Sequence, residues 1–213
     1  MFVDEPDRRV WLATLAETCR RTLWKVHSYA QLGNHYHLVV ETPEPNISAG
    51  MQYLGGTYAI RFNHAHNFSG HLQHRRFDAR LIESDGYALE VARYVALNPV
   101  RAGLCQRPEE WPWASYRGII GLEPPDVFVD IDRTLKLFGT EREQARDALR
   151  AFVEDAIRTP PPLRVQPTLA MILGTGTPER IRLAHFVHGF TLGEIAEHLG
   201  VSIATVHRRA RGW

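Results

Sequence analysis

The sequence predicts an α+β protein that ends in a small all-α domain. In the first 122 residues, segments with apolar side chains at helical spacing are interspersed with short segments in which apolar and polar side chains alternate. The proline run Thr159-Pro160-Pro161-Pro162 then favours an extended spacer. Beyond it, residues 177–213 are typical of three short helices.

The first predicted elements are a helix and a hairpin. Residues 8–23 carry apolar side chains close to helical spacing. Residues 24–32 and 35–42 contain alternating β-branched or aromatic side chains, and Gly33-Asn34 between them suits a two-residue turn. We therefore expect two strands that close a tight antiparallel hairpin.

A second helix should follow the hairpin, capped by Asn46 or Ser48 and running to about Asn63. Residues 77–82 alternate in polarity, which predicts a third strand.

A third helix should begin at a cap, Ser84 or Asp85, and run to Leu97. Asn98-Pro99 should end it, because the residue before a proline is pushed out of the α region.

The order helix, strand, strand, helix, strand, helix matches a ferredoxin-like antiparallel sheet with helices that lacks its first strand. We expect this domain to cover residues 1–122. Residues 123–158 form a mostly surface-exposed helical extension, with a helix over residues 131–157. Residues 159–168 form the proline-rich linker.

Length and composition are those of a soluble globular protein. The 213 residues are 44% hydrophobic, and no apolar run of about 18 residues predicts a transmembrane helix. The acidic start, residues 1–7, lacks the apolar stretch of a secretory signal. The two cysteines, Cys19 and Cys105, lie far apart without metal-type spacing, so we expect a reducing, cytoplasmic location.

Charge is balanced overall, at +1, but is unevenly distributed. Residues 61–80 hold four histidines, one acid and four arginines, which are Arg61, Arg75, Arg76 and Arg80. A local basic stretch in a balanced chain suits a groove that contacts phosphates. A solvated loop that happens to be basic is the alternative that composition leaves open.

Two histidines two positions apart, His35 and His37, are followed by Leu38-Val39-Val40 in the second predicted strand. Side chains alternate along a strand, so both imidazoles should point to one face. Neutral imidazole is the commonest protein metal ligand, and two of them make half of a divalent-metal site. The alternative is that they fill polar positions at a strand end.

Tyr94 and Asn98 share a face of the third predicted helix, because they are four residues apart. Tyrosine can act as a covalent nucleophile, and attack on a phosphodiester needs a cation to polarise the phosphate. Two histidines and a carboxamide oxygen would leave coordination positions open, as Mg²⁺ or Mn²⁺ can use. A packing tyrosine and a capping asparagine are the alternatives.

Several segments resemble, in order, the REP-associated tyrosine transposases of the single-tyrosine HUH transposase superfamily. The resemblance covers roughly residues 5–122. It is carried by Gly33-Asn34-His35-Tyr36-His37-Leu38, Glu41-Thr42-Pro43, Arg61-Phe62-Asn63, Gly70-His71-Leu72, Arg75-Arg76-Phe77, residues 93–103 and residues 107–116.

The resemblance implies a ferredoxin-like fold and a reaction, the cleavage and rejoining of single-stranded DNA near hairpin-forming palindromes. His35 and His37 would bind the metal, and Asn98 stands where a third ligand is expected. Tyr94 would attack the phosphate to give a 5′-phosphotyrosine link and a free 3′-hydroxyl. Tyr58, on the preceding helix, is a rival nucleophile. Tyr94 is favoured because it adjoins the motif that follows the family's catalytic helix.

The chain departs from the family at three places. Family members usually begin with another strand ahead of the helix that starts here near Arg8, so we expect exposed backbone groups beside the metal strand. Leu72-Gln73-His74 replaces a more aromatic and basic loop, which would change the grip on DNA. Gly33 stands where the family usually has proline, which loosens the turn.

Residues 169–213 should form a helix-turn-helix domain, because residues 190–209 resemble that motif. Ala196 is small where two helices would cross, Gly200 lies at the turn and Ser202 would cap the recognition helix. The spacing of four apolar residues places them in the core of this motif: Ile195, Leu199, Val201 and Val206. The candidates for DNA contact are Thr205, His207, Arg208, Arg209 and Arg211. A three-helix packing or dimerisation module is the alternative.

Three functional hypotheses follow. The first is a metal-dependent strand transferase acting on hairpin-forming single-stranded DNA, with duplex DNA as a further partner of the C-terminal domain. The second is a non-catalytic DNA-binding remnant or regulator, which the missing strand favours. The third, a structural metal-binding protein, fits the transposase-like motifs least. No membrane partner is expected, and a homodimer is left open.

Overall fold

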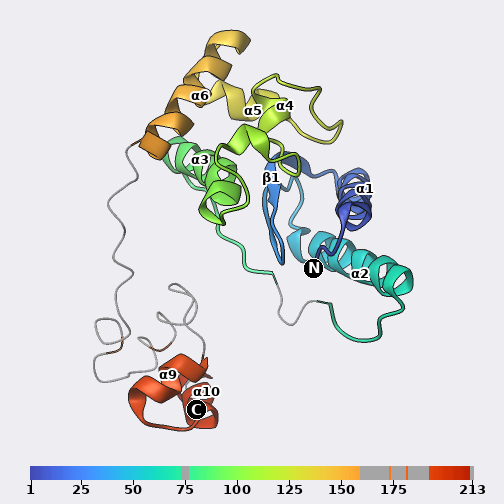
Figure 1. Cartoon of the computed structure of the whole chain (residues 1–213), viewed down its shortest axis with the longest axis vertical. Helices are drawn as coiled ribbons and strands as arrows, with labels where there is room; N and C mark the ends of the chain where they lie inside the picture. Colours follow the sequence, from blue (N-terminus) through green and yellow to red (C-terminus); the bar gives the residue numbers. More distant parts are fainter. Residues whose placement is uncertain (73–76, 159–172, 174–180, 182–191, 212–213) are drawn as a thin grey trace. The chain divides into compact units, whose positions relative to one another are not determined.

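The computed structural model describes residues 1–72, 77–158, 173, 181 and 192–211. The chain divides into two compact units, Met1–Asp155 and Ala156–Trp213. Each unit is described by itself below, and Figure 1 shows the ribbon of the whole chain.

The first unit is built on an antiparallel hairpin, as the alternation predicted. Strand β1 (Lys25–Gln31) pairs with strand β2 (Tyr36–Glu41), with an irregularity between Val26 and Ser28. The turn is closed by the Leu32 amide, which donates to the His35 carbonyl at 2.9 Å. This turn fixes the register that carries the two histidines.

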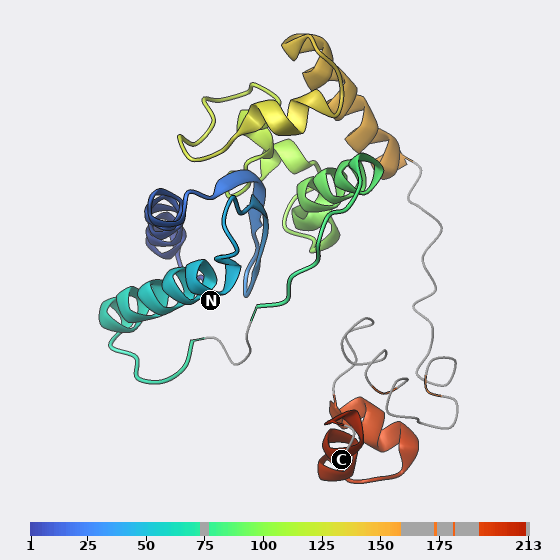
Figure 2. The same ribbon diagram turned by 180° about the vertical axis from the view of Figure 1, so that it is seen from behind.

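One face of the hairpin is covered by two helices, α1 (Glu5–Thr22) and α2 (Ile47–His66), as the two ribbon views show (Figures 1 and 2). The core between them contains Trp11, Leu15, Val26, Tyr29, Leu54 and Tyr58, and Tyr36, Leu38 and Val40 of β2 pack against it. Helix α1 begins three residues earlier than predicted, because Asp4 and Asp7 form a reciprocal capping box.

Asn46 occupies the N-cap position of α2 as predicted, but its side chain makes no capping bond. Instead its amide nitrogen donates to the Thr22 carbonyl, and its oxygen accepts from the Trp24 indole at 2.7 Å. Asn46 therefore joins the end of α1 to the start of α2.

Helix α3 (Asp85–Arg101) covers the opposite face of the hairpin. Val95 and Val91 cluster with Ala30, Leu32 and Val39. Neighbouring side chains of a strand point to opposite faces, so α3 lies across the sheet from α1 and α2. Ser84 caps α3, as predicted, by accepting from the Tyr87 amide at 3.2 Å.

The prediction that Asn98-Pro99 ends this helix is wrong. Helix α3 continues to Arg101 with Pro99 inside it. Pro99 lies in the last turn and removes only the hydrogen bond to the Val95 carbonyl. The Ala102 amide still donates to the Asn98 carbonyl at 2.9 Å, so the helix closes past the proline.

The predicted third strand is also wrong, because residues 77–83 form neither helix nor strand. Phe77 and Leu81 are exposed, Leu81 by 79%. The outer edge of β1 is occupied instead: Gln31 and Tyr29 exchange backbone bonds with residues 113–115, and the Val26 carbonyl accepts from Asp130. Among the described residues the sheet has two strands; with the helices around it this is an α+β fold, and the ferredoxin-like sheet is not confirmed.

Three short elements follow, η1 (Pro108–Glu110), α4 (Tyr116–Ile119) and α5 (Ile131–Lys136), and then the longer helix α6 (Arg142–Arg158). The single helix predicted over residues 131–157 is thus two helices. The Trp111 indole donates to the Gln31 carbonyl at 2.8 Å, which anchors the segment before α4 to β1. Trp111 packs against the cluster beneath α3, and Tyr116 is buried.

The described part of the second unit consists of helices α9 (Leu192–Leu199) and α10 (Ile203–Arg211). Ile195, Ala196 and Val206 are buried together with Leu173 and Ile181, and Leu199 and Val201 pack against them. Gly200 has φ of 63° at the turn, and Ser202 accepts from the Thr205 amide. The predicted proline linker and most of the first predicted helix of this domain lie outside the described residues.

Candidate metal and tyrosine site

His35 and His37 both point to the face of the hairpin that α3 covers. Val39, the next residue of the same parity, packs in the cluster with α3. The two imidazole rings lie edge to face with centroids 5.1 Å apart. His35 is exposed and His37 is half-buried. The strand thus presents two ring nitrogens side by side at the rim of the sheet.

Tyr94 meets these rings from α3. Its ring lies edge to face against His37, with centroids 5.3 Å apart and an interplanar angle of 86°. The next three residues of α3 are buried, while Tyr94 is 46% exposed. Packing of the buried residues therefore fixes the helix and leaves the phenol beside His37 and open to solvent.

The pKa values of both histidines are lowered. Burial lowers the pKa of His37 to about 4, with a smaller contribution from the charge of His35. Burial also lowers the pKa of His35. Both rings are therefore neutral at pH 7, which is the state that binds metal.

The Asn34 side chain fixes the proton of His35. Nδ1 of His35 lies 2.7 Å from Oδ1 of Asn34. An amide oxygen can only accept, so Nδ1 carries the proton and the lone pair stays on Nε2. A hydrogen bond to the non-ligating nitrogen is the usual support of a metal-binding histidine. The donor set of His35 and His37 therefore fits a divalent cation.

Asn98, the expected third ligand, is used within its own helix. Its side chain is only 7% exposed, and its Nδ2 donates to the Tyr94 carbonyl at 2.8 Å. The structure thus brings together His35, His37 and Tyr94. Asn98 lies next to this group through its hydrogen bond to the backbone carbonyl of Tyr94.

Tyr58 does not meet the histidines. It is fully buried between α1 and α2, and its hydroxyl donates to the Met1 carbonyl at 2.9 Å. Burial raises its pKa. A phenol enclosed on the other face of the hairpin cannot reach a phosphate held by His35 and His37.

The predicted DNA-contacting arginines of the first unit differ in their surroundings. Arg61 donates to Thr14 and Glu17 at 2.7 and 3.1 Å and so joins α2 to α1. Arg80 is exposed in the irregular segment before α3. Arg75 and Arg76 lie outside the described residues. Both described arginines of this group are exposed, but the guanidinium of Arg61 is held by α1.

In the second unit Thr205 is half-buried and its hydroxyl contacts Ser202, while Arg209 is exposed on α10. The backbone of His207, Arg208 and Arg211 lies on α10, and their side chains lie outside the described residues.

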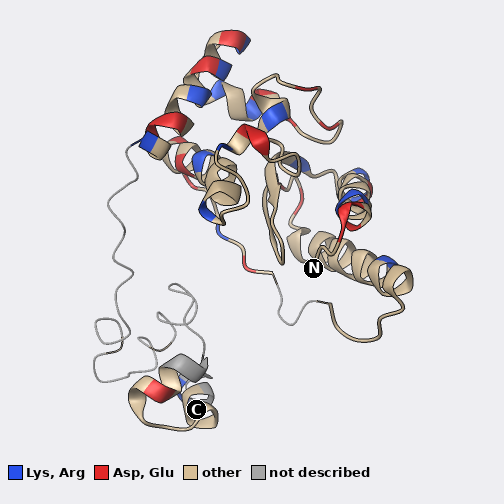
Figure 3. Cartoon of the chain, in the orientation of Figure 1, with Lys and Arg blue, Asp and Glu red and all other residues tan. Residues whose placement is uncertain are grey.

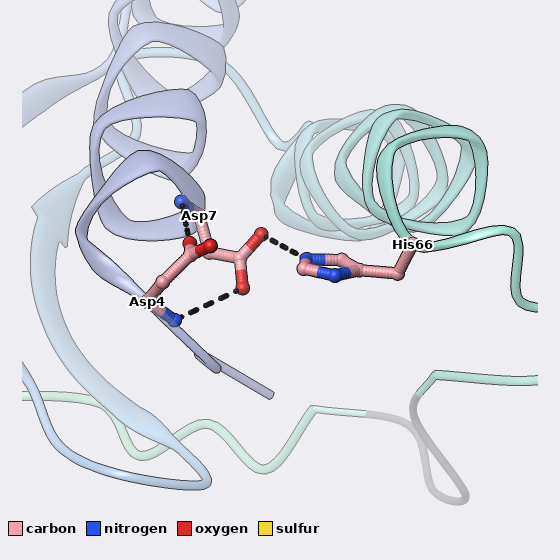
Figure 4. Close-up of side chains that lie close together, drawn as sticks. All are labelled: Asp4, Asp7 and His66. Carbon is pink, nitrogen blue, oxygen red and sulfur yellow. Dashed lines mark hydrogen bonds and ion pairs between the residues drawn. The ribbon is translucent and has the colours of Figure 1, made fainter.

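One cluster was missed by the sequence reasoning. Asp4, Asp7 and His66 bring ligand atoms within 4.8 Å of one another, as the close-up in Figure 4 shows. Their contacts are already assigned: Asp7 accepts from the Val3 and Asp4 amides and from His66 at 2.8 Å. The cluster therefore ties the start of α1 to the end of α2. The spacing of Asp4 and Asp7 could have shown the capping box.

Charge is sparse around the hairpin. Figure 3 shows β1 and the body of α2 almost free of charged residues, whereas α1 and α6 are densely charged. In the described part of the chain, no helix is both long and apolar enough to cross a lipid bilayer.

No family model, no curated protein and no solved structure matches this chain.

Proposed function

We propose that this chain cleaves and rejoins single-stranded DNA at hairpin-forming palindromes through a 5′-phosphotyrosine intermediate. The observation that carries the proposal is the contact of three rings from two distant parts of the sequence. His37 comes from β2, His35 from the turn residue just before it, and Tyr94 from α3. The resemblance of the motifs around these residues to REP-associated tyrosine transposases supports the same reaction.

The histidines are the residues that would hold a divalent metal, Mg²⁺ or Mn²⁺. Both are neutral at pH 7, and the Nε2 lone pair of His35 is available because Asn34 holds Nδ1. When bound, such an ion polarises the scissile phosphate and offsets its charge. Asn98 is proposed as a third ligand by resemblance, and its Oδ1 would bind the ion because its Nδ2 donates to the Tyr94 carbonyl.

Tyr94 supplies the nucleophile. Its phenolic oxygen forms a bond to phosphorus while the bond from phosphorus to the 3′ oxygen breaks. The phenolic proton passes to water, and the departing 3′ oxygen takes a proton from water, so a free 3′-hydroxyl is left. Reversal of these steps rejoins strands. The packed turn of α3 below Tyr94 holds the phenol in place, which is worth orders of magnitude in rate.

The C-terminal helices are proposed to bind duplex DNA. Helix α10 begins at the Ser202 cap and carries exposed Arg209 beside Thr205, as a recognition helix would. Arg209 would contact phosphates and Thr205 would approach base edges.

A second candidate function is binding of hairpin DNA without cleavage. The observation that favours it is the two-strand sheet: β2, which carries His37 and directly follows His35, has a strand partner on one side only among the described residues. An edge strand holds its side chains less rigidly than a central one, and catalysis needs the histidines fixed.

The experiment is a capture of covalent products. Purified protein is incubated with Mn²⁺ and a pool of single-stranded DNA hairpins with randomised flanks, and DNA attached to denatured protein is sequenced. We expect adducts at the 5′ end of one product and none with Tyr94→Phe. Tyr53→Phe is the matched control, because Tyr53 bonds Glu17 on the other face of the hairpin.

An adduct that persists in Tyr94→Phe would show that another residue is the nucleophile. Hairpin binding by the wild-type protein without any adduct would establish the binding function instead.

A further inference from the structure

Arg101 lies against the ring of Tyr94. It stands seven residues later in the last turn of α3, about 10 Å further along the axis and on the same stripe of the helix. Helical side chains lean toward the N-terminus, so the long arginine side chain reaches back. Its Cζ lies 5.3 Å from the centroid of the Tyr94 ring.

The charge of Arg101 is not committed to an acidic partner. Arg101 is exposed and takes part in no ion pair among the described residues. Arg93 of the same helix is different, because it pairs with Glu90 and lies 4.3 Å over the ring of Phe152. One arginine of α3 thus packs against α6, and the other lies beside the phenol without an acidic partner in the described part of the chain.

These contacts form a row of His35, His37, Tyr94 and Arg101, with successive separations of 5.1, 5.3 and 5.3 Å. The Tyr94 ring thus contacts both the histidine pair and a guanidinium. A guanidinium over an aromatic ring keeps its N–H donors for other partners, and they can bind an anion near the phenol.

We propose that Arg101 binds the non-bridging oxygens of the phosphodiester that Tyr94 attacks. This inference rests on the proposed function and adds the residue that holds the scissile phosphate. As the bond from Tyr94 to phosphorus forms and the bond to the 3′ oxygen breaks, negative charge gathers on those oxygens. Arg101 donates two parallel hydrogen bonds to them, and no proton is transferred from it.

The test compares Arg101→Ala and Arg101→Lys with Arg20→Ala. Arg20 is a matched control, because it is also an exposed arginine in the last turn of a helix, α1, on the other face of the hairpin. Binding is measured in a Tyr94→Phe background, with a hairpin oligonucleotide from the pool, over a range of salt concentrations. Adduct formation is timed with each variant in the Tyr94 background.

We expect Arg101→Ala to reduce the salt slope of binding by about 0.7, the value of one phosphate contact on a single strand. The rate of adduct formation should fall about 10²–10³-fold, as when one charge-stabilising donor is removed. Arg101→Lys should keep the salt slope but recover only part of the rate, because lysine lacks the planar fork. Arg20→Ala should change neither quantity.

The contact is located with a neutral methylphosphonate at the scissile position. The wild-type protein should bind the methylphosphonate DNA more weakly than the unmodified DNA. Arg101→Ala should bind the two DNAs equally, because the contact is already lost. If the methylphosphonate weakens binding of Arg101→Ala as much as binding of the wild type, Arg101 contacts another phosphate and the proposal is overturned. A salt slope and rate unchanged in Arg101→Ala would also overturn it, and would show that the arginine only stacks on the ring.

Failure of the proposed function gives a different result. If the wild-type protein forms no adduct while Arg101→Ala still reduces the salt slope of hairpin binding, the phosphate contact stands and strand cleavage does not.

Discussion

At the scale of single residues, the candidate site depends on side chains held in one protonation state. His37 is neutral because α3 and its own strand exclude water from it, and Asn34 fixes the proton of His35 on Nδ1. Two predictions follow from these two contacts, and neither requires that the substrate be known.

The pKa of His37 predicts a loss of stability on acidification. Its folded value of about 4 lies below the usual 6.5, so the unfolded chain binds the proton more readily. The stabilising contribution is complete above pH 6.5 and is lost as pH falls toward 4. In metal-free protein we therefore expect His37→Gln to show a smaller drop in the free energy of unfolding from about pH 7.5 to about pH 5 than the wild type.

Urea unfolding at both pH values measures this drop. Exposed His64, on α2, provides the control, because His64→Gln should leave the drop unchanged. An equal drop in His37→Gln and wild type would mean that the ring is solvated.

The Asn34 contact predicts an effect on metal affinity. Asn34→Ala should weaken Mn²⁺ binding about 10–100-fold, since the bond that orients the ring and sets its tautomer is lost. Asn34→Asp keeps an acceptor at the same place and should recover the affinity. Titration calorimetry with Mn²⁺ measures both, and unchanged affinity in Asn34→Ala would remove this residue from the site.

At the scale of elements, helix α2 contains two glycines with opposite surroundings. A Cβ on Gly50 would lie 2.1 Å from the Trp24 ring, whereas a Cβ on Gly56 would meet nothing within 4 Å. Gly50→Ala should therefore lower the free energy of unfolding by about 1–3 kcal/mol through overpacking. Gly56→Ala should raise it by about 0.5–1 kcal/mol through helix propensity.

Thermal and urea unfolding of both variants checks this pair. A stabilised Gly50→Ala would show that α2 can move away from Trp24 without cost.

The end of α1 offers another prediction. Leu23 ends the helix in the left-handed conformation, with φ of 60°, and is 66% exposed. A leucine is strained there by roughly 1–2 kcal/mol, and asparagine tolerates the conformation better. Leu23→Asn should raise the free energy of unfolding by about 1 kcal/mol, and the β-branched Leu23→Val should lower it. The opposite order would place Leu23 in the core.

Local patterns predicted most of these elements. The helix at α1, the hairpin and the caps at Ser84 and Ser202 depend on contacts close in sequence, which periodicity and capping residues report. Residues 77–82 have the alternation of a strand but pair with neither described strand, and residues 113–115, which are distant in sequence, hold the outer edge of β1 instead. No local pattern reveals that competition.

The same limit applies to the site. The spacing of His35 and His37 predicts their common face, and the turn predicts their strand. The approach of Tyr94 depends on α3 packing on Ala30 and Leu32, which no sequence spacing specifies. The stacking of Arg101 required helix α3 to pass Pro99, where the sequence predicted an end.

At the scale of the whole molecule, the chain forms two compact units joined near residue 155. The core of the first unit lies between the hairpin and its helices, and the core of the second unit is made of its own residues. We expect a chain of residues 1–158 to keep the near-ultraviolet circular dichroism and the main unfolding transition of the full protein. Loss of that transition would show that the first unit needs the second to fold.

Strand β1 is completed by partners that arrive late in the sequence. Tyr29 bonds Ser115 and Asp126, 86 and 97 residues away, and the His27 carbonyl accepts from Thr134, 107 residues away. During synthesis the ribosome therefore releases the hairpin long before anything can cover its open side. Closing such long loops slows folding, and an uncovered strand edge invites pairing with other nascent chains. The time for which the nascent chain needs chaperones should accordingly depend on how soon residues 113–134 leave the ribosome.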